Sequence, residues 1–192
     1  MKKPLIIIIL TLVSIVAIIY FKAENKYDSA EVKINIASMG ADGYKNTSYI
    51  LDGEEIIMKN GVAETESAPG SAMKKTTTYF GNEVKYDFNK DGRKDMAFLV
   101  SQETGGTGVF FYIVVALNTQ TGYKGTEGFF IGDRIAPQTT NIEENGTMIV
   151  NYVDRAVDEG LTAEPSIGKS LRLVFDREDE FHWKLNHGMQ LN

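Results

Sequence analysis

The chain has 192 residues, a net charge of −6, and apolar and charged fractions of 43% and 24%, which are typical of an ordinary globular protein with room for one domain and some extra segments. It contains no cysteine, so disulfide bonds, zinc sites with thiolate ligands and a lipidated cysteine are excluded. The acidic balance argues against nucleic acid or an anionic lipid surface as the main partner.

The first 21 residues have the pattern of a membrane segment. Lys2 and Lys3 precede an uncharged, almost wholly apolar run from Leu5 to Phe21, which as a helix would span roughly 25 Å at about 1.5 Å per residue. The lysines favour an N-terminus inside the cell and a body outside the cytoplasm, at the cell surface or in the periplasm. We expect an uncleaved transmembrane anchor. A cleaved signal peptide is the alternative, although bulky residues stand two positions before Ala17 and Ala23, where a small residue is usual.

Residues 22–46 are predicted to form a polar linker, because charged and small polar residues replace the apolar run there. The alternation of Val32, Ile34 and Ile36 leaves a short additional strand open. The folded body is then expected to cover residues 47–192.

The body is rich in turn dipeptides and period-2 apolar patterns, and convincing amphipathic helices are scarce. Five dipeptides are suited to hairpin turns because their residues tolerate positive φ: Asp52-Gly53, Asn60-Gly61, Gly81-Asn82, Gly105-Gly106 and Asn145-Gly146. Between them we expect strands near 75–80, 83–87, 95–102 and 109–118, forming a four-stranded antiparallel meander, and the fully apolar last strand should be central. The predicted fold is all-β, a mostly antiparallel meander or sandwich-like domain after an N-terminal transmembrane helix.

The segment "DFNKDGRKD" places oxygen-bearing side chains at alternate positions. Asp87, Asn89 and Asp91 occupy positions 1, 3 and 5, the glycine at position 6 permits a sharp bend, Arg93 at position 7 would contribute its backbone carbonyl, and Asp95 at position 9 would close the shell. Calcium takes six to eight oxygen ligands at about 2.3–2.6 Å, which such a loop can supply. Position 12 of an EF-hand is a bidentate Glu, whereas Phe98 stands there in this chain. We therefore expect a calcium loop between strands, with the side chain of Arg93 free to point away.

The pattern D-x-N-x-D-G-x-x-D between strands resembles the calcium loops of FG-GAP and VCBS-type repeats, found in integrin α-chain propellers and in bacterial surface proteins. The resemblance covers roughly residues 79–115. Those repeats occur in series and this chain has one, so a closed propeller is not expected. A longer stretch, including "TGGTGVFFY" and "GDRIAPQTT", is similar to a group of uncharacterised anchored or secreted bacterial proteins, which implies an extracytoplasmic β domain and no known activity.

The acidic segment also has simpler interpretations. Asn, Asp and Gly are turn residues in their own right, so a solvated acidic turn is the alternative to a calcium loop. If calcium binds, a structural ion is favoured over a catalytic one, because the loop would saturate the metal with its own ligands.

Two Asp-Arg pairs, Asp133-Arg134 and Asp154-Arg155, each follow a predicted strand. Brought together, they could line a cleft for a polar ligand such as a glycan or a carboxylate, and Asp133 or Asp154 could then serve a hydrolase. Ion pairs that hold loops in place are the alternative.

Two weaker patterns do not point to a site. The glycines within 104–108 lead into a β run rather than a P-loop helix. The two histidines, His182 and His187, have no third obvious ligand for zinc.

Two functions from different classes remain from the sequence. The first is a membrane-tethered, extracytoplasmic, calcium-binding β domain that acts as a binding or structural module, with an envelope glycan or a surface protein as partner. The second is a hydrolase of envelope polymers that uses Asp133 or Asp154. A catalytic carboxylate needs a raised pKa, so the surroundings of these two side chains distinguish the hypotheses.

Overall fold

The computed structural model of the chain describes residues 40–67, 70–176 and 183–185, and these residues form an antiparallel β fold. Within these ranges no helix is both long and apolar enough to cross a bilayer. The predicted anchor, most of the predicted linker and both histidines lie outside the described residues. The elements are a 3₁₀ helix η1 (Gly43–Asn46) and the strands β1 (Ser48–Leu51), β2 (Glu54–Ile57), β3 (Val62–Glu66), β4 (Lys74–Tyr86), β5 (Asp95–Glu103), β6 (Val109–Thr119), β7 (Gly122–Gly125), β8 (Phe129–Asp133), β9 (Ala136–Ile142), β10 (Met148–Asp154), β11 (Ile167–Phe175) and β12 (Trp183–Leu185).

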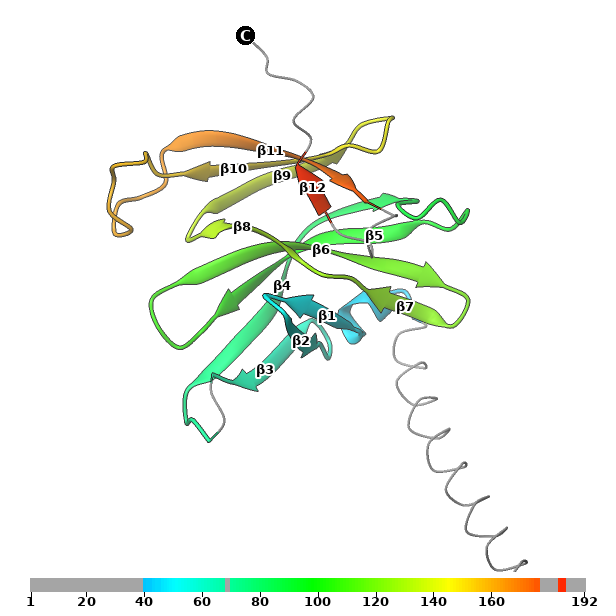
Figure 1. Cartoon of the computed structure of the whole chain (residues 1–192), viewed down its shortest axis with the longest axis horizontal. Coiled ribbons are helices and arrows are strands. Elements are labelled where there is room, and N and C mark those ends of the chain that lie inside the picture. Colours follow the sequence, from blue (N-terminus) through cyan, green and yellow to red (C-terminus); the bar gives the residue numbers. More distant parts are fainter. Residues whose placement is uncertain (1–39, 68–69, 177–182, 186–192) are drawn as a thin grey trace, which may run out of the picture. The chain divides into compact units, whose positions relative to one another are not determined.

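The described strands form three sheets. The largest has the order β3-β4-β5-β6-β7, with β8 pairing with the first part of β6 while β7 pairs with its end. A second sheet has the order β12-β11-β10-β9, and β1 and β2 form a hairpin of their own. Figure 1 shows the four-stranded sheet on one side of the central sheet and the β1-β2 hairpin on the other. The predicted all-β, antiparallel character is confirmed.

The central strands are buried on both faces, because successive residues of β5 and β6 point into two different cores. Phe98 and Val114 pack with the β1-β2 hairpin and η1, whereas Leu99 and Ile113 pack with the four-stranded sheet. This two-sided burial explains why β6 has an uninterrupted apolar sequence, and it confirms the prediction that β6 is central.

Most of the expected turns occupy the places that their dipeptides predict. Asp52 and Gly53 have φ values of 50° and 80° and connect the paired residues Leu51 and Glu54, so β1 and β2 are joined by a two-residue turn of the predicted kind. The turns at 60–61, 105–106 and 145–146 likewise fall between antiparallel partners.

The prediction of a turn at Gly81-Asn82 is wrong, since β4 continues from Lys74 to Tyr86 without reversing. Gly81 and Asn82 do have positive φ values of 121° and 54°, but they produce a bulge at which the register with β5 shifts. The two strands expected at 75–80 and 83–87 are therefore one long strand that pairs along β5.

The folded body begins before residue 47, because part of the predicted linker packs on the central sheet. Tyr44 is 4% exposed, and its ring lies 5.4 Å, centroid to centroid, from that of Phe98. Its hydroxyl donates to the carboxylate of Glu83 on β4, which also accepts a hydrogen bond from Tyr79. Burial and the neighbouring Glu83 carboxylate raise the pKa of Tyr79 to about 12 and that of Tyr44 further still, so both phenols remain donors at neutral pH.

Candidate functional site

The acidic loop between β4 and β5 is organised by its own side chains. The two carboxylate oxygens of Asp87 accept hydrogen bonds from the backbone N–H groups of Asp91, at 3.0 Å, and Gly92, at 2.9 Å. The side-chain oxygen of Asn89 also accepts from Asp91 N, at 3.1 Å, and Asp91 Oδ1 accepts from Arg93 N, at 2.9 Å. Gly92, with φ of 88°, allows the sharp bend that the sequence predicted. The alternating oxygen-bearing residues therefore turn toward the interior of the loop.

Three of the predicted ligands are brought close together by this arrangement. Oxygens of Asp87 and Asn89 meet at a single N–H group, that of Asp91, and so lie within a few ångströms of one another. A carboxylate or amide oxygen that accepts one hydrogen bond retains a lone pair for a cation. The side chains of Asp87, Asn89 and Asp91 thus fit a cation with oxygen ligands, which is the donor chemistry that calcium prefers.

Asp95 is fixed at the base of the loop and is only 1% exposed. Its Oδ2 accepts a hydrogen bond from Phe88 N and its Oδ1 one from Asn118 N on β6, each at 2.8 Å. Burial raises the pKa of Asp95, and the hydrogen bonds from the backbone of Asn118 and Phe88 oppose that rise. Asp95 therefore fastens the loop to two strands, a role that the sequence pattern did not reveal.

The prediction that the Arg93 side chain points away from the loop is wrong. Its Nε donates to the carbonyl oxygen of Asn118, at 2.7 Å, and its guanidinium group pairs with the carboxylate of Asp91. The Arg93 backbone N–H, the Asn89 amide and the Arg93 guanidinium together hold the pKa of Asp91 below its usual range. Arg93 thus neutralises part of the loop's negative charge and ties the loop to the end of β6.

Acidic, imidazole and thiol side chains alone do not build a metal site in the described part of the chain: no group of three or more such residues is close enough to hold an ion. A cation in the acidic loop would also need the amide oxygen of Asn89 and the backbone carbonyl predicted at Arg93. A cation from solvent would reach the oxygens of Asp87, Asn89 and Asp91 more readily than those of Asp95, which is only 1% exposed.

The first Asp-Arg pair is an ion pair within one turn. The guanidinium group of Arg134 donates to both oxygens of Asp133, at 3.0 and 2.6 Å, and Asp133 Oδ1 also accepts from Val109 N, at 3.0 Å. The Arg134 hydrogen bonds, with the backbone N–H of Val109, hold the pKa of Asp133 below its usual range.

The second pair separates into two different interactions. Asp154 binds Lys169 Nζ at 2.8 Å, whereas the nearly buried Arg155 donates to the carbonyl oxygens of Ala163 and Arg134. Hydrogen bonds from Lys169 and the Arg155 N–H outweigh partial burial and lower the pKa of Asp154. Arg155 brings the two turns together, but neither carboxyl group has the raised pKa of a catalytic acid.

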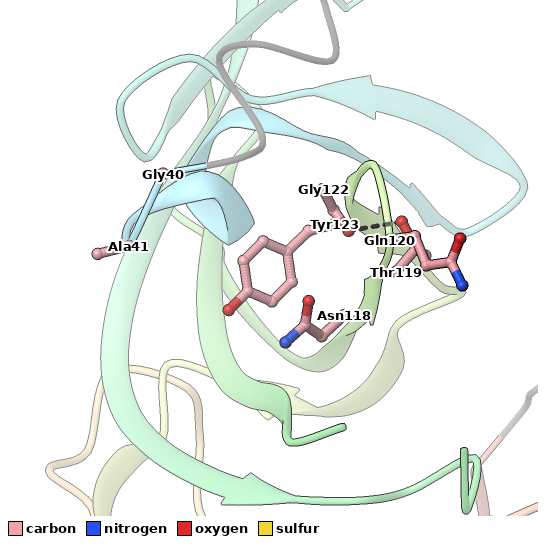
Figure 2. Close-up of a pocket in the computed structure, with 7 residues that line it drawn as sticks. All are labelled: Gly40, Ala41, Asn118, Thr119, Gln120, Gly122 and Tyr123. Atoms are coloured by element: carbon pink, nitrogen blue, oxygen red, sulfur yellow. Dashed lines mark hydrogen bonds between the residues drawn. The ribbon is translucent and has the colours of Figure 1, made fainter. Parts of the chain in front are cut away.

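A polar pocket of about 260 Å³ lies at the turn between β6 and β7, beside the acidic loop (Figure 2). It is lined by Gly40, Ala41, Asn118, Thr119, Gln120, Gly122 and Tyr123. Figure 2 shows the Tyr123 ring between Asn118 on one side and Gly40 and Ala41 on the other. No motif in the sequence predicted this pocket. The signal that could have drawn attention to it is the cluster of amide, hydroxyl and aromatic residues in "NTQTGY" directly after the apolar strand.

The fold and the site together define a class: an antiparallel β domain in which an acidic, self-organised loop is attached to a central sheet buried on both faces. Comparison with known proteins finds no matching family, no matching curated protein and no matching solved structure.

Proposed function

We propose that the chain is a membrane-tethered, extracytoplasmic β domain that binds calcium in its acidic loop and acts as a binding or structural module. The observation that carries this proposal is the convergence of the oxygens of Asp87 and Asn89 on one backbone N–H, with Asp91 next to them. In the FG-GAP and VCBS-type loops that this segment resembles, the same spacing surrounds calcium.

Calcium suits the proposed location and the proposed role. Outside the cytoplasm calcium is abundant, so even the weak sites of extracellular modules, with dissociation constants of about 10⁻⁴–10⁻³ M, are occupied to a useful extent. An ion in this loop would hold the β4-β5 connection in place, and β5 is a strand that contributes to both cores. A structural role follows from this position in the fold.

The first prediction concerns calcium and stability. An ion that binds the folded loop and not the unfolded chain stabilises the fold by RT ln(1 + [Ca]/Kd), about 2.7 kcal/mol at a hundredfold excess over Kd. We expect millimolar calcium to raise the melting temperature of the purified chain by several degrees relative to chelator. Magnesium should substitute poorly because it requires tight octahedral geometry and gives up its water ligands reluctantly.

Variants in the loop make this test specific. Asp87→Ala should abolish the calcium response, whereas Lys90→Ala should retain it, because Lys90 is an exposed residue between the ligand positions. Melting curves that coincide in chelator and in millimolar calcium would remove the ion from the proposal.

The second prediction concerns the tether. The uncharged run from Leu5 to Phe21, preceded by two lysines, should remain attached and leave the body outside the cytoplasm. Protease added to intact spheroplasts should therefore digest the body. Full protection while the membrane is intact would contradict this topology, and a mature N-terminus beyond Phe21 would contradict the anchor.

A further inference from the structure

The pocket at the β6-β7 turn has the chemistry of a site for a small neutral ligand. None of the seven residues that line it carries a charged side chain, although the acidic loop is adjacent. Its volume of about 260 Å³ is slightly below the range of roughly 300–1,000 Å³ that is usual for drug-sized ligands, so it suits one compact ring rather than a long molecule.

Polar groups in the pocket remain available for a ligand. The side-chain oxygen of Asn118, the side-chain amide of Gln120 and the hydroxyl group of Tyr123 form no hydrogen bond with the described part of the chain. Together they present an acceptor, an amide and a phenol at the border of one small cavity. Polar groups that line a pocket fix the orientation of a ligand and give it specificity.

The aromatic wall of the pocket is held rigidly. The Tyr123 ring packs edge-on against that of Tyr44, at 5.9 Å between centroids, and against the core on that side of the central sheet. The Tyr123 carbonyl oxygen accepts a hydrogen bond from Thr47 Oγ1, at 3.0 Å. A fixed aromatic ring bordered by amide and hydroxyl groups complements a sugar ring, whose C–H face is apolar and whose rim carries hydroxyl groups.

Asn118 connects the pocket directly to the acidic loop. Its backbone N–H donates to Asp95, its carbonyl oxygen accepts from Arg93, and its Nδ2 donates to Lys94 O at 3.2 Å. Three bonds from successive parts of the loop thus determine where the Asn118 side-chain oxygen lies. The loop therefore acts as the support of this side of the pocket.

From these observations we infer that the β6-β7 pocket binds a single neutral sugar unit of a glycan. The Tyr123 ring is its stacking surface, and the Tyr123 hydroxyl, Asn118 and Gln120 are its hydrogen-bonding groups. This inference deepens the proposed binding role by naming the class of ligand. The sugar site needs the loop as a support, but it does not require a cation to be bound in the loop.

The test measures sugar binding by the purified full chain. Methyl β-D-glucoside, methyl β-D-galactoside and N-acetylglucosamine are each titrated while saturation transfer from the protein to the sugar is recorded by NMR. We expect transfer to at least one of the three. Gln120→Ala removes one amide and Tyr123→Phe removes one hydroxyl while keeping the ring, so each should weaken binding about fivefold, the effect of one hydrogen bond. Lys124→Ala, an exposed neighbour outside the pocket lining, is the matched control and should bind like the parent.

The outcomes separate the pocket from the calcium loop. No transfer to any of the three sugars would overturn the inference, and so would transfer that is equal in Gln120→Ala, Tyr123→Phe and the parent chain. Sugar binding can be lost in these variants while the melting temperature of the parent chain does not change with calcium. That result would support the sugar site and contradict the calcium loop. Glucuronate is the charged comparison, and binding of this sugar alone would overturn the assignment to a neutral ligand.

Discussion

Among single residues, Asp95 and Arg155 are charged groups placed almost out of contact with water, and in both cases backbone groups provide the compensation. Asp95 accepts from the N–H groups of Phe88 and Asn118, and Arg155 donates to the carbonyl oxygens of Ala163 and Arg134. A buried charge is tolerated only when hydrogen bonds replace its hydration. These two residues therefore hold loops against strands, and their positions explain why the loops keep a definite shape.

The third prediction concerns Asp133, whose pKa is held below its usual range mainly by the Arg134 guanidinium group. A lowered folded-state pKa means that the carboxylate stabilises the fold above its unfolded pKa of about 3.9, and that this contribution is lost as pH falls through the folded pKa. Asp133→Asn should therefore lower the melting temperature at pH 7 by a few degrees, corresponding to about 1 kcal/mol for a partly exposed pair.

The pH dependence distinguishes this effect from a simple loss of packing. The difference in melting temperature between Asp133→Asn and the parent should disappear in acid, once the parent carboxyl group is protonated. Asp158→Asn, at an exposed position, is the control and should match the parent at both pH values. Loss of a hydrolytic activity in Asp133→Asn at unchanged stability would instead support the hydrolase hypothesis.

At the scale of elements, the sequence predicts hairpins well where a turn dipeptide separates two strands of matching pattern. It fails at Gly81-Asn82 for a physical reason: positive φ values serve a bulge as readily as a turn, and the choice depends on whether the partner strand continues. β5 is long enough to pair with both halves of β4, so the chain bends without reversing. That length becomes visible only when the two strands are paired.

At the candidate site too, the sequence predicts the local features and does not predict the contacts with distant strands. The spacing of Asp87, Asn89 and Asp91 indicates a tight loop, and oxygens of Asp87 and Asn89 do accept a hydrogen bond from the loop's own backbone, because alternation within a short turn is a local property. Their role as metal ligands stays a prediction. The orientation of Arg93 depends on Asn118 at the end of β6, which lies 25 residues further along the chain. Asn118 both accepts from Arg93 and lines the pocket, and neither contact is local in sequence. Contacts of this range leave no local pattern in the sequence.

The fourth prediction concerns Gly125, the last residue of β7. A Cβ atom there would lie 1.9 Å from the carbonyl oxygen of Ser48 on β1 and 2.7 Å from the Tyr49 ring. Gly125→Ala should therefore force the β1-β2 hairpin away from β7, at a cost of about 2–3 kcal/mol. Gly106→Ala is the control, since a Cβ atom there meets nothing within 4 Å. Thermal unfolding checks both variants, and equal stability of the two would contradict the close approach.

Over the whole described fold, the two cores share the strands β5 and β6, so neither core can be lost while the other keeps its packing. Phe98 and Leu99 are neighbours in sequence, and each is fully buried in a different core. We therefore expect one cooperative unfolding transition for the described residues, 40–67, 70–176 and 183–185.

The fifth prediction tests this cooperativity with the chain's only tryptophan, Trp183, which belongs to the core between the central and four-stranded sheets. Ile56→Ala changes the opposite core, where Ile56 is 1% exposed, and should cost about 2–5 kcal/mol. Trp183 fluorescence should report this loss as a shift of the whole denaturation curve. Ile57→Ala is the matched control, because Ile57 is 58% exposed and its truncation should change stability by less than about 0.5 kcal/mol. If the denaturation curve recorded by Trp183 fluorescence is the same in Ile56→Ala and in the parent chain, the two cores unfold separately.

The two-sided burial of β5 and β6 also restricts how this sequence can diverge. In a strand with one solvent-exposed face, every second position tolerates substitution. Residues 96–100 and 111–117 are all buried, so they lack this tolerance. Substitutions should therefore accumulate in the turns and on the outer strands, while these two apolar runs change slowly. Descendants of a common ancestor that have lost all other similarity should still be recognisable by this pair of runs.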